Sequence, residues 1–306
     1  VTMFEKDEKP GGILRFGIPD FKLSKTVIDR RVDLMIREGV DVRTGVRIGT
    51  DIPFGEIIIK YDAVCIAIGS GFPRDLNVEG REFRGIHFAM DFLTARNRVN
   101  AGILTETDRE KSAEGKRVLV IGGGDTGSDC VGTAIRQKAA GVTQIEILPK
   151  PPAERAQDNP WPWYARILKT STSHEEGCER LWGISTIRFV GDGSITRGAE
   201  IEEVKWESVG GKKIMTPVPG TRRVIEADLI LLALGFLHPV TDGFTYGSGI
   251  ELDNRKNIKV GDNLCTNLSG VFAAGDAVSG ASLAVNAIAS GRKCAIETDR
   301  FLRKND

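Results

Sequence analysis

Short apolar runs alternate along this chain with longer segments of helical periodicity. Near-continuous apolar runs are typical of strands that are buried on both faces. Such runs occupy residues 62–69, 117–121, 143–148, 227–234 and 270–275. Helices are expected at 24–38, from the GGGDTG stretch through about Gln137, and at 281–303, while residues 184–190 and 197–207 alternate like antiparallel strands. This order of strand, turn, helix and strand predicts an α/β fold with parallel sheets covered on both faces.

The clearest helix signal lies at residues 24–38. Val27, Leu34 and Met35 fall on one face of the predicted helix. Gly39 follows at the position where a glycine often ends a helix, because it adopts the left-handed backbone conformation without strain. We therefore expect an amphipathic helix with a defined end.

The segment 149–183 breaks the pattern. It contains PKPP, NPWPWY and a polar SHEEG stretch, and predicts a long excursion between strands with one helix near 163–170. Trp161 and Trp163 are expected at the start of that helix, packed against the domain, with a partner surface as the alternative. His174 lacks metal-ligand spacing and is expected in a solvated turn.

Two apolar strands that end in Ala-x-Gly, at Gly69 and Gly235, flank the middle of the chain. This arrangement predicts a domain at 91–234 inserted into an outer domain formed by 1–90 and 235–306.

The strongest chemical signal is GGGDTG, in which Gly122, Gly124 and Gly127 match G-x-G-x-x-G. The motif follows the strand at 117–121 and opens a helix, which is the context that dinucleotide binding requires. The glycines permit a tight turn, close approach to a pyrophosphate and close packing of helix on strand. The helix N-terminus offers free N–H groups to phosphate. The alternative is a glycine-rich structural turn.

Residues at the end of the next strand select the nucleotide. An acidic residue there binds the ribose 2′-hydroxyl of NAD, whereas a cation favours the 2′-phosphate of NADP. Glu146 is expected inside the strand at 143–148, and Lys150 and Arg155 follow it. The sequence therefore favours NADPH, with a solvated surface lysine as the alternative for Lys150.

The outer domain carries a second nucleotide signal. The first five residues, VTMFE, read as a strand ending in an acid at Glu5, the arrangement that binds a ribose. An apolar strand at 270–275 ends in Gly275 and Asp276, and a helix follows. In flavoproteins with two nucleotides, such an aspartate lies beside the flavin ribityl or phosphate groups, and the helix dipole stabilises negative charge on reduced flavin. The alternative is a strand of no special function and an acidic helix cap.

Composition narrows the possible functions. The 306 residues include 42 Lys and Arg and 42 Asp and Glu, so no basic field favours nucleic acid or an acidic membrane. No apolar run reaches the length of a membrane span, and the first residues lack the pattern of a signal peptide. Five scattered cysteines and three histidines form no dithiol, metal or iron–sulfur motif. We expect a cytoplasmic protein with no bound metal.

These features together give the chain a family resemblance. It resembles the small (beta) subunit of NADPH-dependent glutamate synthase over nearly its whole length. The segments that carry the resemblance are Gly11–Leu23, Gly122–Ala134, Glu146–Trp163 and Val271–Ile288. The resemblance implies two Rossmann-like domains of the pyridine-nucleotide-disulfide-oxidoreductase type, one for FAD and one for NADPH. It implies that NADPH reduces FAD and that electrons pass through iron–sulfur clusters to the large subunit, where glutamine and 2-oxoglutarate become glutamate.

The resemblance also assigns residues. The implied FAD-binding residues are Glu5, Gly12, Leu14, Val46, Ala67, Gly69, Gly275, Asp276 and Ala284. The implied NADPH-binding residues are Gly122, Gly124, Asp125, Thr126, Gly127, Lys150 and Arg155. Hydride transfer from nicotinamide to flavin depends on stacking and orientation, so no catalytic acid or base is expected.

Two family features have no counterpart here: the N-terminal cysteine-rich region for iron–sulfur clusters and the first glycine-rich loop for FAD. We therefore expect a truncated FAD domain, with FAD affinity lowered about 10²- to 10³-fold by the missing backbone hydrogen bonds. An exposed sheet edge predicts self-association, which light scattering can test. The alternatives are a related NADPH reductase module with another electron acceptor, and a non-catalytic module that binds NADP(H) or docks a partner.

Overall fold

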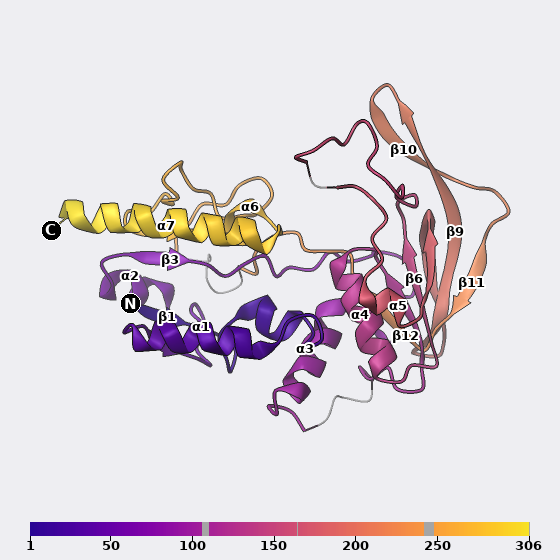
Figure 1. Cartoon of the computed structure of the whole chain (residues 1–306), viewed down its shortest axis with the longest axis horizontal. Coiled ribbons are helices and arrows are strands. Elements are labelled where there is room, and N and C mark those ends of the chain that lie inside the picture. Colours follow the sequence, from indigo (N-terminus) through magenta and orange to yellow (C-terminus); the bar gives the residue numbers. More distant parts are fainter. Residues whose placement is uncertain (106–109, 164, 242–247, 306) are drawn as a thin grey trace. The chain divides into compact units, whose positions relative to one another are not determined.

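The computed structural model describes residues 1–105, 110–163, 165–241 and 248–305 (Figure 1). The chain divides into two compact units. The first unit comprises Val1–Gly11, Thr26–Arg74 and Gly235–Asp306, and the second comprises Gly12–Lys25 and Asp75–Leu234.

A parallel five-stranded sheet forms the centre of the second unit. Its strands, in spatial order, are β4 (Ile86–Phe88), β12 (Leu229–Leu232), β5 (Arg117–Ile121), β6 (Gly141–Glu146) and β7 (Glu179–Trp182). Every neighbouring pair is parallel. The carboxyl ends of all five strands therefore lie at one edge of the sheet, where nucleotides bind in open α/β folds.

Both faces of this sheet are covered, as the apolar runs predict. On one face, Val118 and Val120 pack into a core with residues of α3 (Ala89–Asn100) and α4 (Asp125–Arg136). On the other face, Leu119 and Ile121 pack against residues of an antiparallel sheet. Successive side chains of a strand point to opposite faces, so β5 needs apolar residues at nearly every position.

The antiparallel sheet confirms the alternating pattern of the sequence. Its strands are β8 (Ile184–Asp192), β9 (Ile195–Val209), β10 (Lys212–Pro217) and β11 (Arg223–Glu226). The long strand β9 pairs with the other three, and Figure 1 shows it running into the β9–β10 hairpin. Gly193 has a φ of +61° in the turn between β8 and β9. Phe189 and Ile201 face the parallel sheet and are almost fully buried.

The second unit also includes residues that the sequence places in the outer domain. Residues 12–25 contain the π-helix η1 (Ile13–Gly17), and the buried Asn97 of α3 donates hydrogen bonds to the carbonyls of Phe16 and Ile18, at 2.8 and 3.1 Å. Strand β4 pairs with the central strand β12. The compact units divide after residues 11, 25, 74 and 234, and the assignment of 1–90 and 235–306 to one domain and 91–234 to the other stays a prediction.

The first unit contains two separate two-stranded parallel sheets. One pairs β1 (Thr2–Phe4) with β2 (Asp41–Arg43), and the other pairs β3 (Val64–Ile66) with β13 (Val271–Ala273). Its helices are α1 (Lys25–Arg37), α2 (Phe54–Lys60), α6 (Asp276–Ser279) and α7 (Ala284–Asn305). Among the described residues, no helix combines the length and apolar character needed to cross a membrane.

Helix α1 confirms the predicted helix but not its buried face. Val27, Leu34 and Met35 are 47, 44 and 42% exposed, and Ile28 is the buried residue of the helix. Gly39 has a φ of +94°, as expected for the glycine that follows a helix. Periodicity thus predicts the helix, although it does not identify the contacts of its apolar stripe.

The prediction of a helix near 163–170 is wrong for the described residues of that range. The four-residue helix α5 lies later, at Thr172–Glu175, and the side chains of Trp161 and Trp163 are 81 and 69% exposed. Prolines 160 and 162 lack the N–H groups that a helix uses, and Arg155 holds the carbonyls of Asn159 and Trp163 by hydrogen bonds of 3.0 and 2.9 Å.

The contacts of Asn97 lead to a prediction. Replacing Asn97 by Ala leaves the Phe16 carbonyl without its amide donor, and we expect a loss of about 1–3 kcal/mol in the free energy of unfolding of the second unit. Limited proteolysis should show faster cleavage within 12–25. The matched control is Asn100→Ala, because Asn100 lies exposed on the same helix. Equal cleavage of both variants would show that Asn97 does not hold this segment.

Candidate dinucleotide site

The turn between β5 and α4 depends on two of its glycines. Gly122 has a φ of +123°, and a Cβ added there would overlap the carbonyl oxygen of Ala233 at the end of β12. A Cβ at Gly127 would overlap the carbonyl oxygen of Gly122. Only glycine therefore lets the backbone of α4 approach the ends of β5 and β12 this closely.

Gly124 has a different environment. Its backbone is extended, with φ −79° and ψ −172°, and an added Cβ would meet no atom within 4 Å. The fold itself therefore does not require glycine at this position. The open space lies directly before the N-terminus of α4, where helical N–H groups and the positive end of the dipole favour phosphate. This is the geometry expected where a backbone approaches a pyrophosphate.

Glu146 lies at the edge of the same turn. Strand β6 ends at Glu146, whereas the sequence pattern places this residue inside a strand that continues to 148. Its carboxylate accepts hydrogen bonds from the N–H groups of Gly123, at 2.7 Å, and Leu148, at 2.9 Å. The carboxylate is thus fixed between the glycine-rich turn and the chain that leaves β6.

The two expected phosphate-binding cations have other contacts. The Lys150 ammonium lies 5.1 Å from the ring centroid of Trp182, within the range of a cation–π interaction. The Arg155 guanidinium donates to the carbonyls of Asn159 and Trp163. The assignment of Lys150 and Arg155 to a 2′-phosphate stays a prediction.

A chain of hydrogen bonds links α5 through β6 to the glycine-rich turn. His174 Nδ1 accepts from the Ser171 N–H at 3.1 Å, so its Nε2 carries the proton and donates to Gln144 Oε1 at 3.0 Å. Gln144 Nε2 then donates to the Gly122 carbonyl at 2.8 Å. His174 is therefore half-buried and bonded, and not in a solvated turn. The one sequence signal was Ser171-x-x-His174, which forms a capping box on α5.

Helix α4 carries a second set of polar contacts. Ser128 Oγ lies 2.6 Å from Ser171 Oγ, and Lys22 Nζ donates to Ser128 Oγ at 3.4 Å. Lys22 also lies 3.7 Å from the Asp129 carboxylate. Burial raises the pKa of Asp129 to about 6, although Lys22 opposes this shift. The glycine-rich turn, α5 and residues 12–25 thus share one polar network.

The candidate flavin residues of the first unit gather at strand ends. The Val46 N–H donates to the Glu5 carbonyl at 3.0 Å, so both lie at the ends of β1 and β2. Gly69 and Gly275, with φ of +71° and +69°, follow the paired strands β3 and β13. Ala67 precedes Gly69, while Asp276 begins α6 and Ala284 begins α7. Ser70 Oγ is buried and has no hydrogen-bond partner among the described residues.

Two further flavin candidates, Gly12 and Leu14, belong to the second unit. Gly12 has a φ of +51° and precedes η1, and Lys25 Nζ donates to the Leu14 carbonyl at 3.0 Å. Their assignment to FAD stays a prediction, as do those of the other candidate residues.

Comparison with known proteins identifies the family. The sequence profile described as pyridine nucleotide-disulphide oxidoreductase matches residues 20–291. The chain belongs to this family.

Relatives of this oxidoreductase include enzymes of glutamate synthesis. It is 44% identical over 305 residues to the NADPH glutamate synthase small chain of Mycobacterium tuberculosis, a match that covers 99% of this chain and 62% of that protein. It is 41% identical to the NADH glutamate synthase of Schizosaccharomyces pombe over 98% of this chain and 15% of that protein. The chain thus spans less than two thirds of the small chain that it resembles.

Solved structures share the fold of this oxidoreductase. Mycobacterium tuberculosis FprA in complex with NADPH superposes with a TM-score of 0.73 at 16% identity, over 99% of this chain and 77% of that chain. Thioredoxin reductase of T. acidophilum superposes with a TM-score of 0.63 at 19% identity, over 99% and 90%. These matches confirm the expected pyridine-nucleotide-disulfide-oxidoreductase fold with two Rossmann-like domains.

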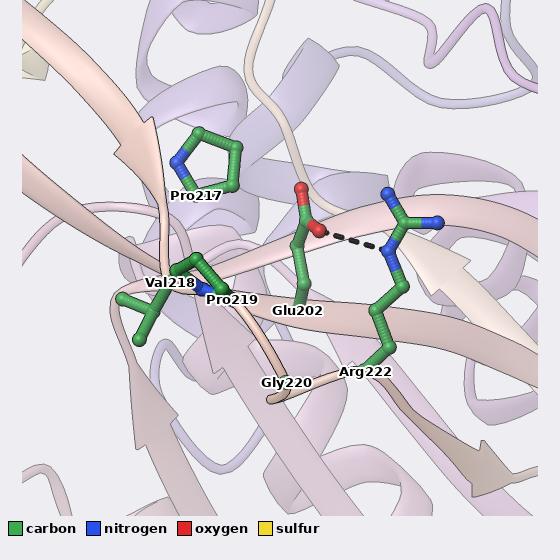
Figure 2. A pocket seen from close by; sticks show the side chains of 6 residues that line it. All are labelled: Glu202, Pro217, Val218, Pro219, Gly220 and Arg222. Atoms are coloured by element: carbon green, nitrogen blue, oxygen red, sulfur yellow. Dashed lines mark hydrogen bonds and ion pairs between the residues drawn. The ribbon is translucent and has the colours of Figure 1, made fainter.

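The second unit of this oxidoreductase also has a hollow of about 310 Å³ away from the glycine-rich turn. It lies between β9 and the loop before β11, and Figure 2 shows its lining residues. The Glu202 carboxylate there is paired with the Arg222 guanidinium at 3.1 Å. None of the candidate residues lines this hollow.

The polar network leads to a pH prediction. Burial, with Arg180 and Lys22 nearby, lowers the pKa of His174 to about 4, below its value of about 6.5 in an unfolded chain. Between pH 6.5 and 4, the unfolded chain therefore binds a proton that the folded chain does not, so stability falls as the pH falls. We expect His174→Gln to lose less stability than the parent chain over this window in urea unfolding.

The free energies of unfolding of the parent chain and His174→Gln are compared at each pH, because titration of Asp129 changes the stability of both in the opposite direction. Its raised pKa makes the folded state more stable below about pH 6, where the group is protonated. His238→Gln is the control, since His238 stacks on Phe72 in the other unit. Parallel pH curves for the parent and His174→Gln would contradict a neutral, buried His174.

Proposed function

We propose that this chain is the electron-input part of a glutamate synthase, in which NADPH delivers a hydride to FAD. The observation that carries the proposal is the glycine-rich turn before α4, with open space at Gly124 beside a helix N-terminus. The 44% identity to a glutamate synthase small chain over 99% of this chain supports the pathway assignment.

The second unit suits a dinucleotide. The N–H groups of the first turn of α4 would bind its pyrophosphate, with Asp125 and Thr126 at the start of the helix and Gly127 packed on the strand. The network from His174 through Gln144 to the Gly122 carbonyl holds the turn in place before any ligand binds. Such preorganisation lowers the entropy cost of binding.

The first unit suits a flavin nucleotide at the ends of β3 and β13. Ser70 Oγ is a buried polar atom that a ligand can satisfy, and Gly69 beside it has open space for close approach. Asp276 accepts a hydrogen bond from Ser282 at 2.9 Å, which orients its carboxylate near the start of α7. When bound, FAD supplies a ring that accepts a hydride from NADPH. The residues of this chain bind and orient the two nucleotides, and none is proposed to transfer a proton.

We further propose that the electrons leave through iron–sulfur clusters to a glutamate synthase large subunit. The support is the relatives' names, since the chain spans 62% of the M. tuberculosis small chain. Cytoplasmic location and self-association stay predictions. A reductase with another acceptor and a pure docking module remain the alternatives, and bound flavin separates the reductases from the docking module.

The first test is an absorption spectrum of the purified chain with added FAD. We expect flavin bands near roughly 450 nm that bleach when NADPH is added under anaerobic conditions, because the cofactor changes colour on reduction. Free FAD with NADPH is the control for slow direct reduction. A chain that binds neither FAD nor NADPH would contradict the proposed reductase.

The second test separates binding from folding at the glycine-rich turn. Gly124→Ala should weaken NADPH binding at least about tenfold, equivalent to 1.4 kcal/mol, because its Cβ enters the space proposed for the pyrophosphate. We expect it to cost about 1 kcal/mol or less in stability, since the fold leaves that space open. Gly127→Ala, whose Cβ would overlap a carbonyl, should instead destabilise the second unit by about 3 kcal/mol.

Calorimetric titration and urea unfolding measure the two effects. If Gly124→Ala binds NADPH as tightly as the parent chain, the pyrophosphate does not lie at this turn.

A further inference from the structure

The end of β6 determines which group faces the adenosine ribose of a dinucleotide bound at the glycine-rich turn. In dinucleotide-binding folds, an acidic residue about 20 positions after the glycine motif ends the second strand and binds the ribose 2′-hydroxyl. Glu146 is the last residue of β6, and β6 pairs directly with β5. The apolar pattern predicts a strand that continues to residue 148, whereas the strand ends at Glu146.

The Glu146 carboxylate is held against the turn. Oε2 accepts the Gly123 N–H at 2.7 Å, and Oε1 accepts the Leu148 N–H at 2.9 Å. A Cβ at Gly123 would lie 2.8 Å from Oε2, so a glycine between the motif glycines Gly122 and Gly124 makes room for this contact. An ionised carboxylate has about four acceptor positions, and two remain for hydroxyl groups of a ligand.

The two cations that follow β6 in sequence, Lys150 and Arg155, already have contacts with other groups of the chain. Lys150 lies over the Trp182 ring, and Arg155 is bonded to two backbone carbonyls. A 2′-phosphate would therefore approach the negative charge of Glu146, whereas a 2′-hydroxyl would donate a hydrogen bond to it. Like charges in close contact weaken binding, and a hydrogen bond to a charged group strengthens it.

We propose that Glu146 is the specificity-determining residue for the adenosine ribose and that it admits NADH to this site as a second electron donor beside NADPH. The proposal rests on the proposed function only in that the turn binds a nicotinamide dinucleotide. The carboxylate binds the 2′-hydroxyl of NADH, and its charge limits the advantage that NADPH gains from its phosphate.

The test compares two probes that differ by one phosphate, ADP-ribose and 2′-phospho-ADP-ribose. Isothermal titration calorimetry of the whole chain gives both dissociation constants without any redox reaction. We expect the parent chain to bind ADP-ribose with an affinity within about tenfold of the phosphorylated probe. In Glu146→Gln, the affinity ratio should shift toward the phosphorylated probe by about 10- to 100-fold, the range expected for a hydrogen bond to a charged group.

Two variants control for structure. Glu146→Asp keeps the charge and should retain most of the parent preference between the two probes. If Glu146 only supported the structure, its replacement by Gln would weaken the binding of both probes equally. Glu179→Gln removes a carboxylate from the adjacent strand β7 and should leave the ratio unchanged. The parent ratio itself is informative even if a variant does not fold.

The outcomes separate this inference from the proposed function. If the chain binds the phosphorylated probe but not ADP-ribose, or if Glu146→Gln leaves the ratio unchanged, the role of Glu146 is overturned while the dinucleotide site stands. If neither probe binds, both the dinucleotide site and the role of Glu146 are overturned.

Discussion

The close approach of α4 to the ends of β5 and β12 is the constraint on which the candidate site depends. It requires backbone without side chains at Gly122 and Gly127, because a Cβ at either would overlap a carbonyl oxygen. The approach brings the N-terminus of α4 to the carboxyl edge of the parallel sheet, where its unpaired N–H groups face outward. Gly122 and Gly127 allow this approach, and the open space at Gly124 lies directly before the helix. Packing therefore places at this edge the groups that would bind a phosphate, as the proposed function requires.

Two side chains of β6 bind adjacent backbone groups of the glycine-rich turn. The Gly122 carbonyl accepts from Gln144, which His174 orients, and the Gly123 N–H donates to Glu146. Gln144 and Glu146 lie two residues apart on β6, so both side chains come from the strand that pairs with β5. Gln144 is buried and Glu146 has a carboxylate, so breaking either hydrogen bond would be costly, and both bonds restrict movement of the turn. A ligand then meets a turn that is already ordered, which lowers the cost of binding.

The sequence predicted the parts of the structure that depend on local pattern. Strand β5, the glycine-rich turn and α4 appear where the motif places them, because the motif and its flanking apolar run occur together. The end of β6 was set two residues late because Ile147 and Leu148 continue the apolar run after the strand has ended. The role of His174 could not be predicted, since its partner Gln144 lies 30 residues earlier and no local pattern links them. The tryptophans of NPWPW were misplaced because proline-rich segments carry no periodicity.

The end of β6 determines which charged side chain lies at the glycine-rich turn, and nearness in sequence does not. Lys150 and Arg155 follow β6 in sequence, and their positive charge favours a 2′-phosphate. In the structure, however, Lys150 lies over the Trp182 ring and Arg155 donates to two backbone carbonyls. Glu146 is the charged residue that the fold fixes at the turn itself. A group held by two backbone N–H bonds keeps its position when a ligand arrives, whereas a lysine on a flexible stem must give up side-chain entropy to do so. In the proposed site, the carboxylate would therefore dominate the electrostatics at the ribose, and Lys150 and Arg155 would act only after leaving their present contacts.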